Sequence, residues 1–415
     1  MRRCVLQPWI SAETGCASQE DLDRWQLERL REILNYAKGR SLFYGEHLSK
    51  VRAEDIARRE DLSRIPFTTA EQLRGDPKSW LCCGAKEIER IITLKTSGTT
   101  AAPKRVFFRQ EDQERTVDFF AHGMRELVSP GDRALILMPG RQPGSVGDLL
   151  RQALERIGVS AVLGEKAADL AATYDLLRTS RCSCIVGIPV QVLGLAEYGA
   201  GLPAGQRAGL KSVLLSADAA HPALVKRVQA LMRCQVFNHF GMTEMGFGAA
   251  VECSVHQGCH LRENHILAEV IDPDTGAPLP DGQPGELVLT TLDRRAMPFL
   301  RYRTGDMGIL LPGPCPCGSF IRRILPWGGR RADRGRLWEL DGVLLACPEV
   351  VDYSFAETAE GLELTLFGVV PPDCREAGRR LAQAGLPPPS RISARTISGF
   401  SGTGMQKRGL SERRA

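Results

Sequence analysis

Between residues 130 and 240, short apolar runs alternate with longer helical stretches, and this alternation restricts the fold more than any other feature of the sequence. The runs read ALILM, CIVGI, SVLL and CQVF, and they occupy residues 134–138, 184–188, 212–215 and 234–237. Apolar runs without polar alternation are typical of strands buried on both faces. Strands that alternate with helices predict a largely parallel sheet covered by helices on both sides, which is an α/β fold.

The sequence on either side of this region follows other patterns. Residues 18–38 place apolar side chains at helical spacing, with Ser18 and Asp21 as a capping pair, and predict an amphipathic packing helix. After residue 265, apolar and polar residues alternate in HILAEVI and GELVLTTL, with a turn-rich segment between them. This alternation predicts antiparallel hairpins and a β-rich subdomain at 265–325.

The length of 415 residues exceeds what one hydrophobic core usually supports, so we expect more than one domain. The glycine- and arginine-rich segment 324–335 predicts a hinge or linker. Beyond it, LELTLFGVV predicts a strand and CREAGRRLAQAG predicts a helix. We therefore expect a large domain at 1–328 and a small α+β domain at 329–415.

Composition narrows the class of protein. The chain is 43% hydrophobic and 25% charged, has no apolar run long enough to span a bilayer, and does not begin like a secretory signal, so we expect a cytoplasmic protein that is not bound to a membrane. Its 54 basic residues nearly balance 49 acidic ones and are not interleaved with aromatics, which disfavours nucleic acid as a partner. Most of the thirteen cysteines are expected to be reduced.

The stretch TLKTSGTTAAPKRVFF at 93–108 follows the apolar run RIITL and suits a phosphate-binding loop. Glycine allows close approach of the backbone to an anion, hydroxyls donate hydrogen bonds, and lysine supplies charge. A Walker loop is excluded because Ala102 and Pro103, not glycine, precede Lys104. A flexible polar loop stays open as the alternative. The candidate phosphate-binding residues are Thr96, Ser97, Gly98, Thr99, Thr100 and Lys104.

Three further stretches carry candidate chemistry. FNHFGMTEMG at 237–246 offers Phe240 as a ring for a purine face and Glu244 as a hard oxygen ligand for Mg²⁺. FLRYRTGDMG places Asp306 in a turn, where its carboxylate can accept both hydroxyls of a ribose. SGFSGTGMQKRGL carries Lys407 on a glycine-rich tip. Helix capping by Glu244 and turn initiation by Asp306 are the structural alternatives.

At these residues the sequence resembles the adenylate-forming superfamily of acyl- and aryl-CoA synthetases, adenylation domains and luciferases. Within it, the match is closest to the phenylacetate-CoA ligase-like branch. The segments LERLREILNYAKGRSLFYGEHL, DLSRIPFTTAEQLR and LRENHILAEVIDPDTGAPLPDGQPGELVLTTLDRRAMPFLRYRTGDMG extend the resemblance over nearly the whole chain. The resemblance implies a large N-terminal adenylate-forming domain with a small, mobile C-terminal lid.

Site roles follow from the same resemblance. It implies that Thr243 reaches the α-phosphate, that Glu244 holds magnesium, and that Lys407 is the mobile lysine of the lid. It also implies that Ala217 and Asp218 contact the adenine. The nucleotide-binding residues implied in full are Thr96, Ser97, Gly98, Thr99, Thr100, Lys104, Ala217, Asp218, Asn238, His239, Phe240, Gly241, Asp306 and Arg330.

The implied reaction consumes ATP and a carboxylic acid to form an acyl-adenylate, and then transfers the acyl group to CoA with release of AMP and pyrophosphate. By analogy with this branch, Phe247 and Gly248 favour an aryl or other apolar acid. Ala101 replaces the glycine usual after the paired threonines, and the lid entry departs from the family pattern. Transfer to a carrier protein or another acceptor, and a non-catalytic nucleotide or acyl sensor, stay open, as does a homodimer.

Two short cysteine- and histidine-containing segments predict a structural zinc site. They are ECSVHQGCH at 252–260 and CPCG at 315–318. Thiolate and imidazole ligands suit tetrahedral zinc, and two ligand pairs from separate loops would join the β-rich subdomain. Some members of the resembled branch carry zinc at corresponding positions. The expected ligands are Cys253, His260, Cys315 and Cys317, with His256 and Cys259 as competitors.

Overall fold

The computed structural model describes residues 4–94, 102–164, 166–331, 335–359 and 361–400. The chain divides into two compact units, which we describe separately. The first unit comprises Met1–Glu126 and His239–Trp327, and the second comprises Leu127–Asn238 and Gly328–Ala415. Within the described residues, no helix has both the length and the apolar character needed to cross a bilayer.

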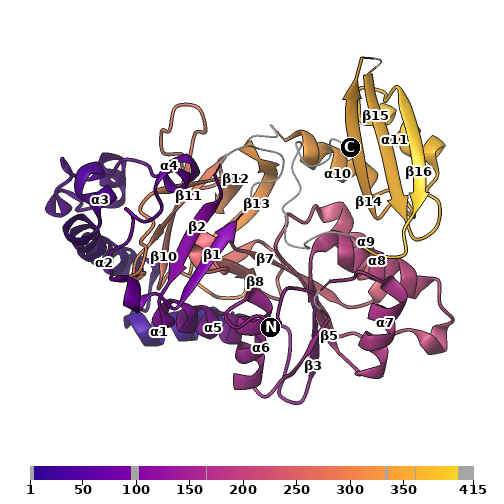
Figure 1. The fold of residues 1–415 in the computed structure, drawn as a ribbon, viewed down its shortest axis with the longest axis horizontal. Coiled ribbons are helices and arrows are strands. Elements are labelled where there is room, and N and C mark those ends of the chain that lie inside the picture. The colour runs from indigo at the N-terminus through magenta and orange to yellow at the C-terminus, as the bar shows by residue number, and fades with distance from the viewer. Residues whose placement is uncertain (1–3, 95–101, 165, 332–334, 360, 401–415) are drawn as a thin grey trace. The chain divides into compact units, whose positions relative to one another are not determined.

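The second unit contains the parallel sheet that the apolar runs predict (Figure 1). All neighbouring strands are parallel, in the order β4, β3, β5, β6, β7. The strands are β3 (Arg133–Ile136), β4 (Ser160–Leu163), β5 (Cys184–Gly187), β6 (Ser212–Leu215) and β7 (Gln235–Phe240). The helices between them are α6 (Val146–Arg156), α7 (Leu170–Thr179), α8 (Pro189–Ala200) and α9 (Pro222–Met232), with the short helix η4 (Ala204–Gln206). The α/β prediction is confirmed.

The C-terminal part of the second unit is α+β, as predicted. Its three strands have the order β14, β15, β16, with an antiparallel first pair and a parallel second pair. The strand and the helix expected from the sequence are β15 and α11. The elements are α10 (Arg336–Leu344), β14 (Asp352–Thr358), β15 (Gly361–Gly368), α11 (Cys374–Gln383) and β16 (Arg391–Thr396). The division into a large domain at 1–328 and a mobile lid at 329–415 stays a prediction.

Residues 398–400 are fixed to the helical layer of the second unit. The Leu170 N–H donates to the Ser398 carbonyl at 2.7 Å, and the Phe400 N–H donates to the Ala167 carbonyl at 2.9 Å. The Phe400 ring packs against Gly194 of α8, where even a methyl group would come within 2.9 Å of it. The last described residues therefore lie at a defined place on this unit.

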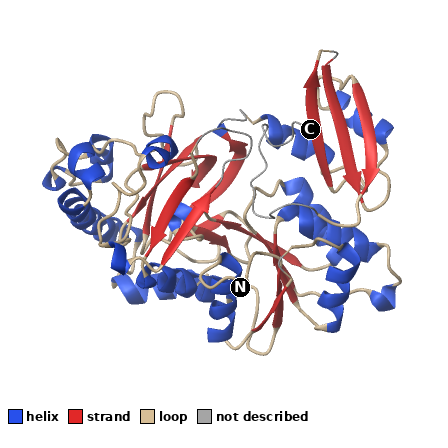
Figure 2. Cartoon of the chain, in the orientation of Figure 1, coloured by secondary structure: helices blue, strands red, loops and turns tan. Residues whose placement is uncertain are grey.

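The first unit combines N-terminal helices with antiparallel strands (Figure 2). Its longest helix, α2, is the one predicted at 18–38, and the Ser18 hydroxyl accepts the Asp21 N–H at 3.1 Å as its cap. The helices are α1 (Leu6–Thr14), α2 (Gln19–Arg40), α3 (Leu42–His47), α4 (Ala70–Gly75) and α5 (Gln110–Met124), with the short helices η1 (Ala53–Asp55), η2 (Arg59–Arg64), η3 (Ala85–Glu87) and η5 (Thr243–Met245). The strands are β1 (Arg90–Leu94), β2 (Lys104–Phe108), β8 (Ala250–Glu252), β9 (Cys259–Leu261), β10 (Ile266–Ile271), β11 (Pro284–Thr291), β12 (Tyr302–Leu311) and β13 (Arg323–Arg330).

The β-rich region follows the predicted pattern, with one correction. Strands β10, β11 and β12 form consecutive antiparallel pairs, so the hairpin prediction is confirmed. The linker predicted at 324–335 is wrong for its first half, because residues 323–330 form β13. In this strand Arg323 pairs with His260 and Ile324 pairs with Cys259. The cause is pairing within the sheet, where β13 lies between β12 and the distant β9, and this overrides the weak strand propensity of two consecutive glycines.

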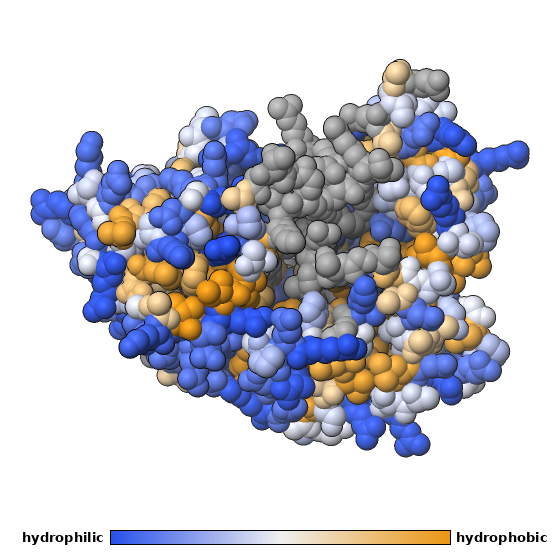
Figure 3. Space-filling view, viewed as in Figure 1, coloured by the Kyte–Doolittle hydropathy of each residue, from blue (hydrophilic) through white to orange (hydrophobic). Residues whose placement is uncertain are grey.

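The core of the first unit is rich in aromatic residues. Trp80, Tyr44, Phe299 and Tyr302 are each at most 1% exposed. The Phe43 and Trp80 rings stack with their centroids 4.2 Å apart. On the face of the chain drawn in Figure 3, hydrophilic side chains predominate and apolar side chains form small groups between them. The strands that carry the candidate site residues are thus held by a closely packed interior.

Candidate active site

A tight turn between β7 and β8 carries Thr243 and Glu244. A methyl group on Gly241 would come within 1.8 Å of the Phe247 carbonyl oxygen, so only glycine fits at this position. The Phe247 N–H donates to the Met242 carbonyl at 2.9 Å, although the φ of Phe247 is 67°. A bulky residue in the left-handed region is uncommon and is characteristic of functional turns. The turn therefore has one closely determined conformation.

The Glu244 carboxylate is buried and paired inside this turn. It is 2% exposed, forms an ion pair with the Lys104 ammonium, and accepts the Tyr302 hydroxyl proton at 2.9 Å. Burial raises the pKa of the Glu244 carboxyl, but Lys104 outweighs burial and holds this pKa below its ordinary value. Glu244 is therefore ionised at neutral pH. Lys104 begins β2, and the fold brings it to Glu244 across 140 residues of sequence.

Tyr302 lies between Glu244 and the second predicted carboxylate, Asp306. Burial, followed by Glu244, raises the pKa of the Tyr302 hydroxyl well above its ordinary value, and Asp306 adds to this effect. Asp306 is 8% exposed on β12. The register of β11 against β12 shifts between Glu286 and Val288, opposite Gly305, whose φ is 72°. This irregularity sets the direction of the residue that follows Gly305.

Arg294 holds the backbone of this turn, and no feature of the sequence had identified it as important. Its guanidinium is buried, donates to the Glu244 carbonyl, and donates to the Phe107 carbonyl at 3.0 Å. The guanidinium carbon lies 4.2 Å from the centroid of the Phe108 ring. Arg294 thus joins the strand that begins at Lys104 to the turn that carries Glu244. In the sequence it is one of two adjacent arginines, with no spacing that distinguishes it.

An aromatic cluster lies beside the turn. The His239 ring is 6.0 Å from Phe119 and 6.1 Å from Phe120, measured between centroids. Burial lowers the pKa of His239 to about 4, so its ring is neutral at physiological pH. A methyl group on Gly248 would come within 2.4 Å of the Phe119 ring. The sequence pointed to Gly248 but not to Phe119 and Phe120, because nothing in α5 separates them from ordinary core residues.

The structure assigns the predicted nucleotide-binding residues to both units. Lys104, His239, Phe240, Gly241, Thr243, Glu244 and Asp306 belong to the first unit, and Ala217, Asp218, Asn238 and Arg330 belong to the second. Phe240 is buried within the core of the first unit. The phosphate-loop residues Thr96, Ser97, Gly98, Thr99 and Thr100 lie outside the described residues, as does Lys407.

In the second unit, the predicted adenine contacts lie at the carboxyl edge of the parallel sheet. Leu215 at the end of β6 is paired with Asn238 of β7, and Ala217 and Asp218 follow two and three residues after Leu215. The φ of Ala217 is 71°, and the Asp218 carboxylate accepts the Ala219 N–H at 2.9 Å. The carboxyl ends of parallel strands are the usual place for ligands in α/β folds. Arg330 is the last residue of β13.

The four predicted zinc ligands come together in the first unit. Cys253, His260, Cys315 and Cys317 are buried, and their ligand atoms all lie within 4.8 Å of one another. The Cys253 and Cys315 sulfurs are 3.9 Å apart, and the Cys317 sulfur is 3.5 Å from His260 Nε2. Cys259 precedes His260 in β9, so the two side chains point to opposite faces of the sheet.

Comparisons with known proteins give three findings. A family model described as AMP-binding enzyme matches residues 14–292. Phenylacetate-coenzyme A ligase from Thermus thermophilus is 33% identical over 353 residues, which are 81% of this chain and 78% of that protein. The Pseudomonas putida protein of the same name is 30% identical over 345 residues, which are 80% of this chain and 74% of that protein.

Among solved structures, 2-hydroxyisobutyryl-CoA ligase in the postadenylation state in complex with 2-HIB-AMP has the same fold. The TM-score is 0.76 at 21% sequence identity, and the match covers 92% of this chain and 86% of that one. This likeness concerns the arrangement of helices and strands alone.

Replacing Arg294 tests its support of the turn. Arg294→Met would leave two buried carbonyls without donors, and we expect a loss of about 2–4 kcal/mol in the free energy of unfolding. Arg294→Lys should lose less, because it keeps one donor group. Urea unfolding followed by fluorescence measures both. Arg295→Met is the matched control, because the Arg295 guanidinium lies over Tyr36 at 4.5 Å. Equal losses for Arg294→Met and Arg295→Met would contradict the assignment.

Proposed function

Because this chain belongs to the AMP-binding enzyme family and is an AMP-forming carboxylate–CoA ligase like the phenylacetate-CoA ligases, we propose that it activates an aryl or other apolar carboxylic acid. The acid would react with ATP to give an acyl-adenylate and pyrophosphate, and the acyl group would then pass to CoA with release of AMP. The observation that carries this proposal is the buried ion pair of Lys104 and Glu244 within the motif expected to bind the nucleotide.

Binding of ATP with magnesium would exchange this ion pair for two new contacts. Lys104 would turn to the phosphates, and the Glu244 carboxylate, ionised and buried, would hold Mg²⁺, which prefers hard oxygen ligands. When bound, magnesium supplies positive charge that stabilises the leaving pyrophosphate. Arg294 would keep the Glu244 backbone fixed during the exchange because it binds the carbonyl and not the carboxylate.

The first half-reaction requires positioning and charge stabilisation more than acid–base catalysis. A carboxylate must attack an α-phosphorus that is surrounded by negative oxygens, so donors and cations must be in place before attack. Thr243 and Lys407 would contact the α-phosphate, and Asp306 would accept the ribose hydroxyls. The rigid turn at Gly241 and Phe247 would place Thr243 without reorganisation at the moment of reaction.

The aromatic cluster beside the turn would receive the apolar part of the acid. The Phe119 and Phe120 rings are buried next to His239, and a histidine with a pKa of about 4 brings no charge at neutral pH. Such a surface favours an aryl or other apolar group over a charged one. A glycine at 248 gives the Phe119 ring room beside the turn.

The second half-reaction depends on the expected lid at 329–415. Rotation of the lid would withdraw Lys407 and admit the thiol of CoA. Transfer to a carrier protein or another acceptor is the alternative, since the lid entry departs from the family pattern. A non-catalytic sensor is a second alternative.

We further propose a cytoplasmic enzyme, with a homodimer as an open question.

We also propose that Cys253, His260, Cys315 and Cys317 hold a structural zinc ion. Three sulfurs and one imidazole nitrogen within 4.8 Å of one another are the donor types and the number that tetrahedral zinc takes. Four protein ligands would leave no position for a substrate. When bound, zinc would cross-link residues 253–260 to the loop between β12 and β13.

Acid-dependent exchange of labelled pyrophosphate into ATP tests the proposed activity. We expect exchange with aryl acids and much less with short polar acids, because the aromatic cluster carries no charge. A panel of aryl and aliphatic acids of equal concentration measures this preference. Glu244→Gln is the control and should lower exchange by about 100-fold. No exchange with any acid, together with retained ATP binding, would indicate the sensor instead.

Lys407→Ala separates the two half-reactions. This variant should lose adenylate formation by at least about 100-fold, because a cation at the α-phosphate is removed. It should still convert chemically prepared acyl-adenylate and CoA into acyl-CoA, which chromatography detects. Unchanged release of pyrophosphate by Lys407→Ala would refute the role of this lysine.

Metal analysis tests the zinc site. Purified protein should contain about one zinc per chain, and a strong chelator should lower the melting temperature. Cys315→Ser should lose zinc, whereas Cys82→Ser should keep it, because Cys82 is equally buried but is not one of the four clustered ligands. Protein that is free of zinc and fully stable would rule out the site.

A further inference from the structure

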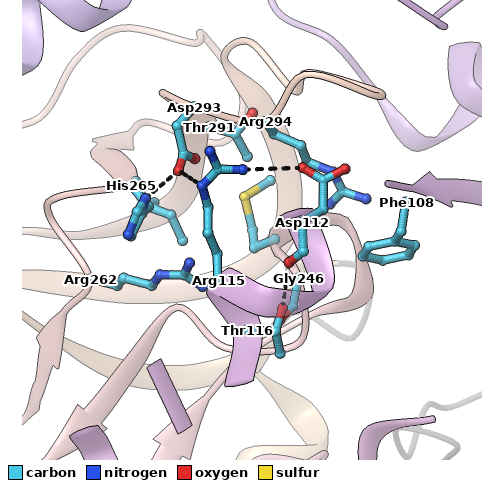
Figure 4. Close-up of a pocket in the computed structure, with 12 residues that line it drawn as sticks. Phe108, Asp112, Arg115, Thr116, Gly246, Arg262, His265, Thr291, Asp293 and Arg294 are labelled. Carbon is cyan, nitrogen blue, oxygen red and sulfur yellow. Dashed lines mark hydrogen bonds and ion pairs between the residues drawn. The ribbon is translucent and has the colours of Figure 1, made fainter. Parts of the chain in front are cut away.

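A hollow in the first unit lies behind the turn that carries Glu244 (Figure 4). The centres of water-sized spheres can occupy about 30 Å³ in it. Met245 and Gly246 of the turn form part of its wall, and α5 forms another part. Its charged lining consists of Asp112, Arg115, Arg262, His265, Asp293 and Arg294. Apart from Arg294, which holds the Glu244 backbone, none of these residues has a role in the proposed transfer of the acyl group.

The two carboxylates of the hollow are already engaged. Asp293 accepts from Arg115 Nε at 2.6 Å and from His265 Nδ1, as the dashed lines in Figure 4 show. Burial raises the pKa of Asp293, but His265, with smaller contributions from Arg115 and Arg262, holds this pKa at about 2. Asp112 accepts the Arg109 backbone N–H at 2.9 Å and lies 3.8 Å from Arg115. The direct contacts of these carboxylates are thus with Arg115, His265 and the Arg109 backbone, while Arg294 attracts the charge of Asp112 and Arg262 attracts that of Asp293.

Arg262 has no such partner. Its side chain belongs to the residue after β9 and is buried, with 4% exposure. No described residue forms a hydrogen bond or an ion pair with its guanidinium, and the buried Nε lacks an acceptor. Aromatic rings provide its contacts, with Phe119 at 5.4 Å and Trp9 at 6.0 Å from the guanidinium carbon. Burial lowers the pKa of Arg262 to about 10, so the group stays charged at neutral pH.

Of the described arginines in the lining, Arg262 is the one without a hydrogen bond or ion pair, although Asp293 attracts its charge through space. Three arginines face two aspartates. The two terminal nitrogens of Arg294 donate to backbone carbonyls, and Arg115 forms ion pairs with the aspartates. Glu13 is nearby but lies 3.2 Å from His265 Nε2. The buried Nε of Arg262 has no acceptor among the described residues, which is costly unless an anion or water satisfies it, and ring contacts offset only part of that cost.

We propose that this hollow binds a small monovalent anion, a halide or a short carboxylate, on the guanidinium of Arg262. The planar fork of arginine matches a carboxylate and also accepts a spherical halide. The ionised Asp293 in the wall disfavours anions of higher charge. Because Met245, Gly246 and Arg294 also line the hollow, the bound anion would stiffen the turn that holds Glu244. This proposal does not depend on the identity of the acid substrate.

Thermal unfolding in increasing bromide, at constant ionic strength, tests the site. The melting temperature of the unaltered protein should rise and saturate, and the same should hold for acetate. Arg262→Gln should lose the saturable rise. Arg295→Gln, which alters a ring-stacked arginine outside the hollow, should keep it. The same non-saturating response in all three proteins would overturn the proposal, because it reports general salt effects.

Anomalous scattering from crystals soaked in bromide provides a second measurement that needs no variant. A bromide peak within hydrogen-bond distance of the Arg262 guanidinium supports the site, and ordered water alone at that position refutes it. If Arg262→Gln fails to fold, Arg262→Lys replaces it, since lysine keeps the charge but not the fork. A saturable rise with weaker affinity in Arg262→Lys supports the proposal, and an unchanged affinity contradicts it.

Discussion

The buried carboxylate of Glu244 is the constraint on which the rest of the candidate site depends. An ionised carboxylate at 2% exposure must be paired, because breaking a buried pair costs roughly 3–5 kcal/mol. Lys104 supplies the charge and Tyr302 supplies a hydrogen bond, so β2 and β12 must both reach the turn after β7. The same pairing that stabilises this part of the fold keeps a lysine and a carboxylate together where nucleotide binding would need them.

Fixed backbone in the turn makes this pairing specific. Gly241 and the left-handed Phe247 bring the two ends of the turn together, and Arg294 holds the Glu244 carbonyl from the opposite side. The carboxylate side of the turn would bind the nucleotide, whereas the carbonyl side faces the hollow that contains Arg262. Two neighbouring environments thus share one rigid segment. One contains a carboxylate paired with a lysine, and the other contains an arginine whose buried Nε has no hydrogen-bond partner among the described residues.

Much of the architecture could be predicted from the sequence because its signals are local. The helix at 18–38, the parallel strands and the hairpin after residue 265 each follow from hydrophobic periodicity, and the structure has all of them. Strand β13 was missed because its two glycines and arginines resemble a linker, and its strand form depends on distant β9. Arg294 and Phe119 were missed for a related reason, since their importance lies in what they contact across the fold.

The sequence by itself determined the kinds of chemistry present: the carboxylates Glu244 and Asp306, the lysine Lys104, and the cysteines and histidine suited to zinc. The spacing of the motifs was sufficient to identify this chemistry, because these residue types seldom occur in this order by chance. Only the tertiary structure decided their partners. It paired Lys104 with Glu244 across 140 residues, gathered His260 but not Cys259 with Cys253, and left the buried Nε of Arg262 without a hydrogen-bond partner among the described residues. Burial and charge pairing are properties of the folded chain, and no local pattern encodes them.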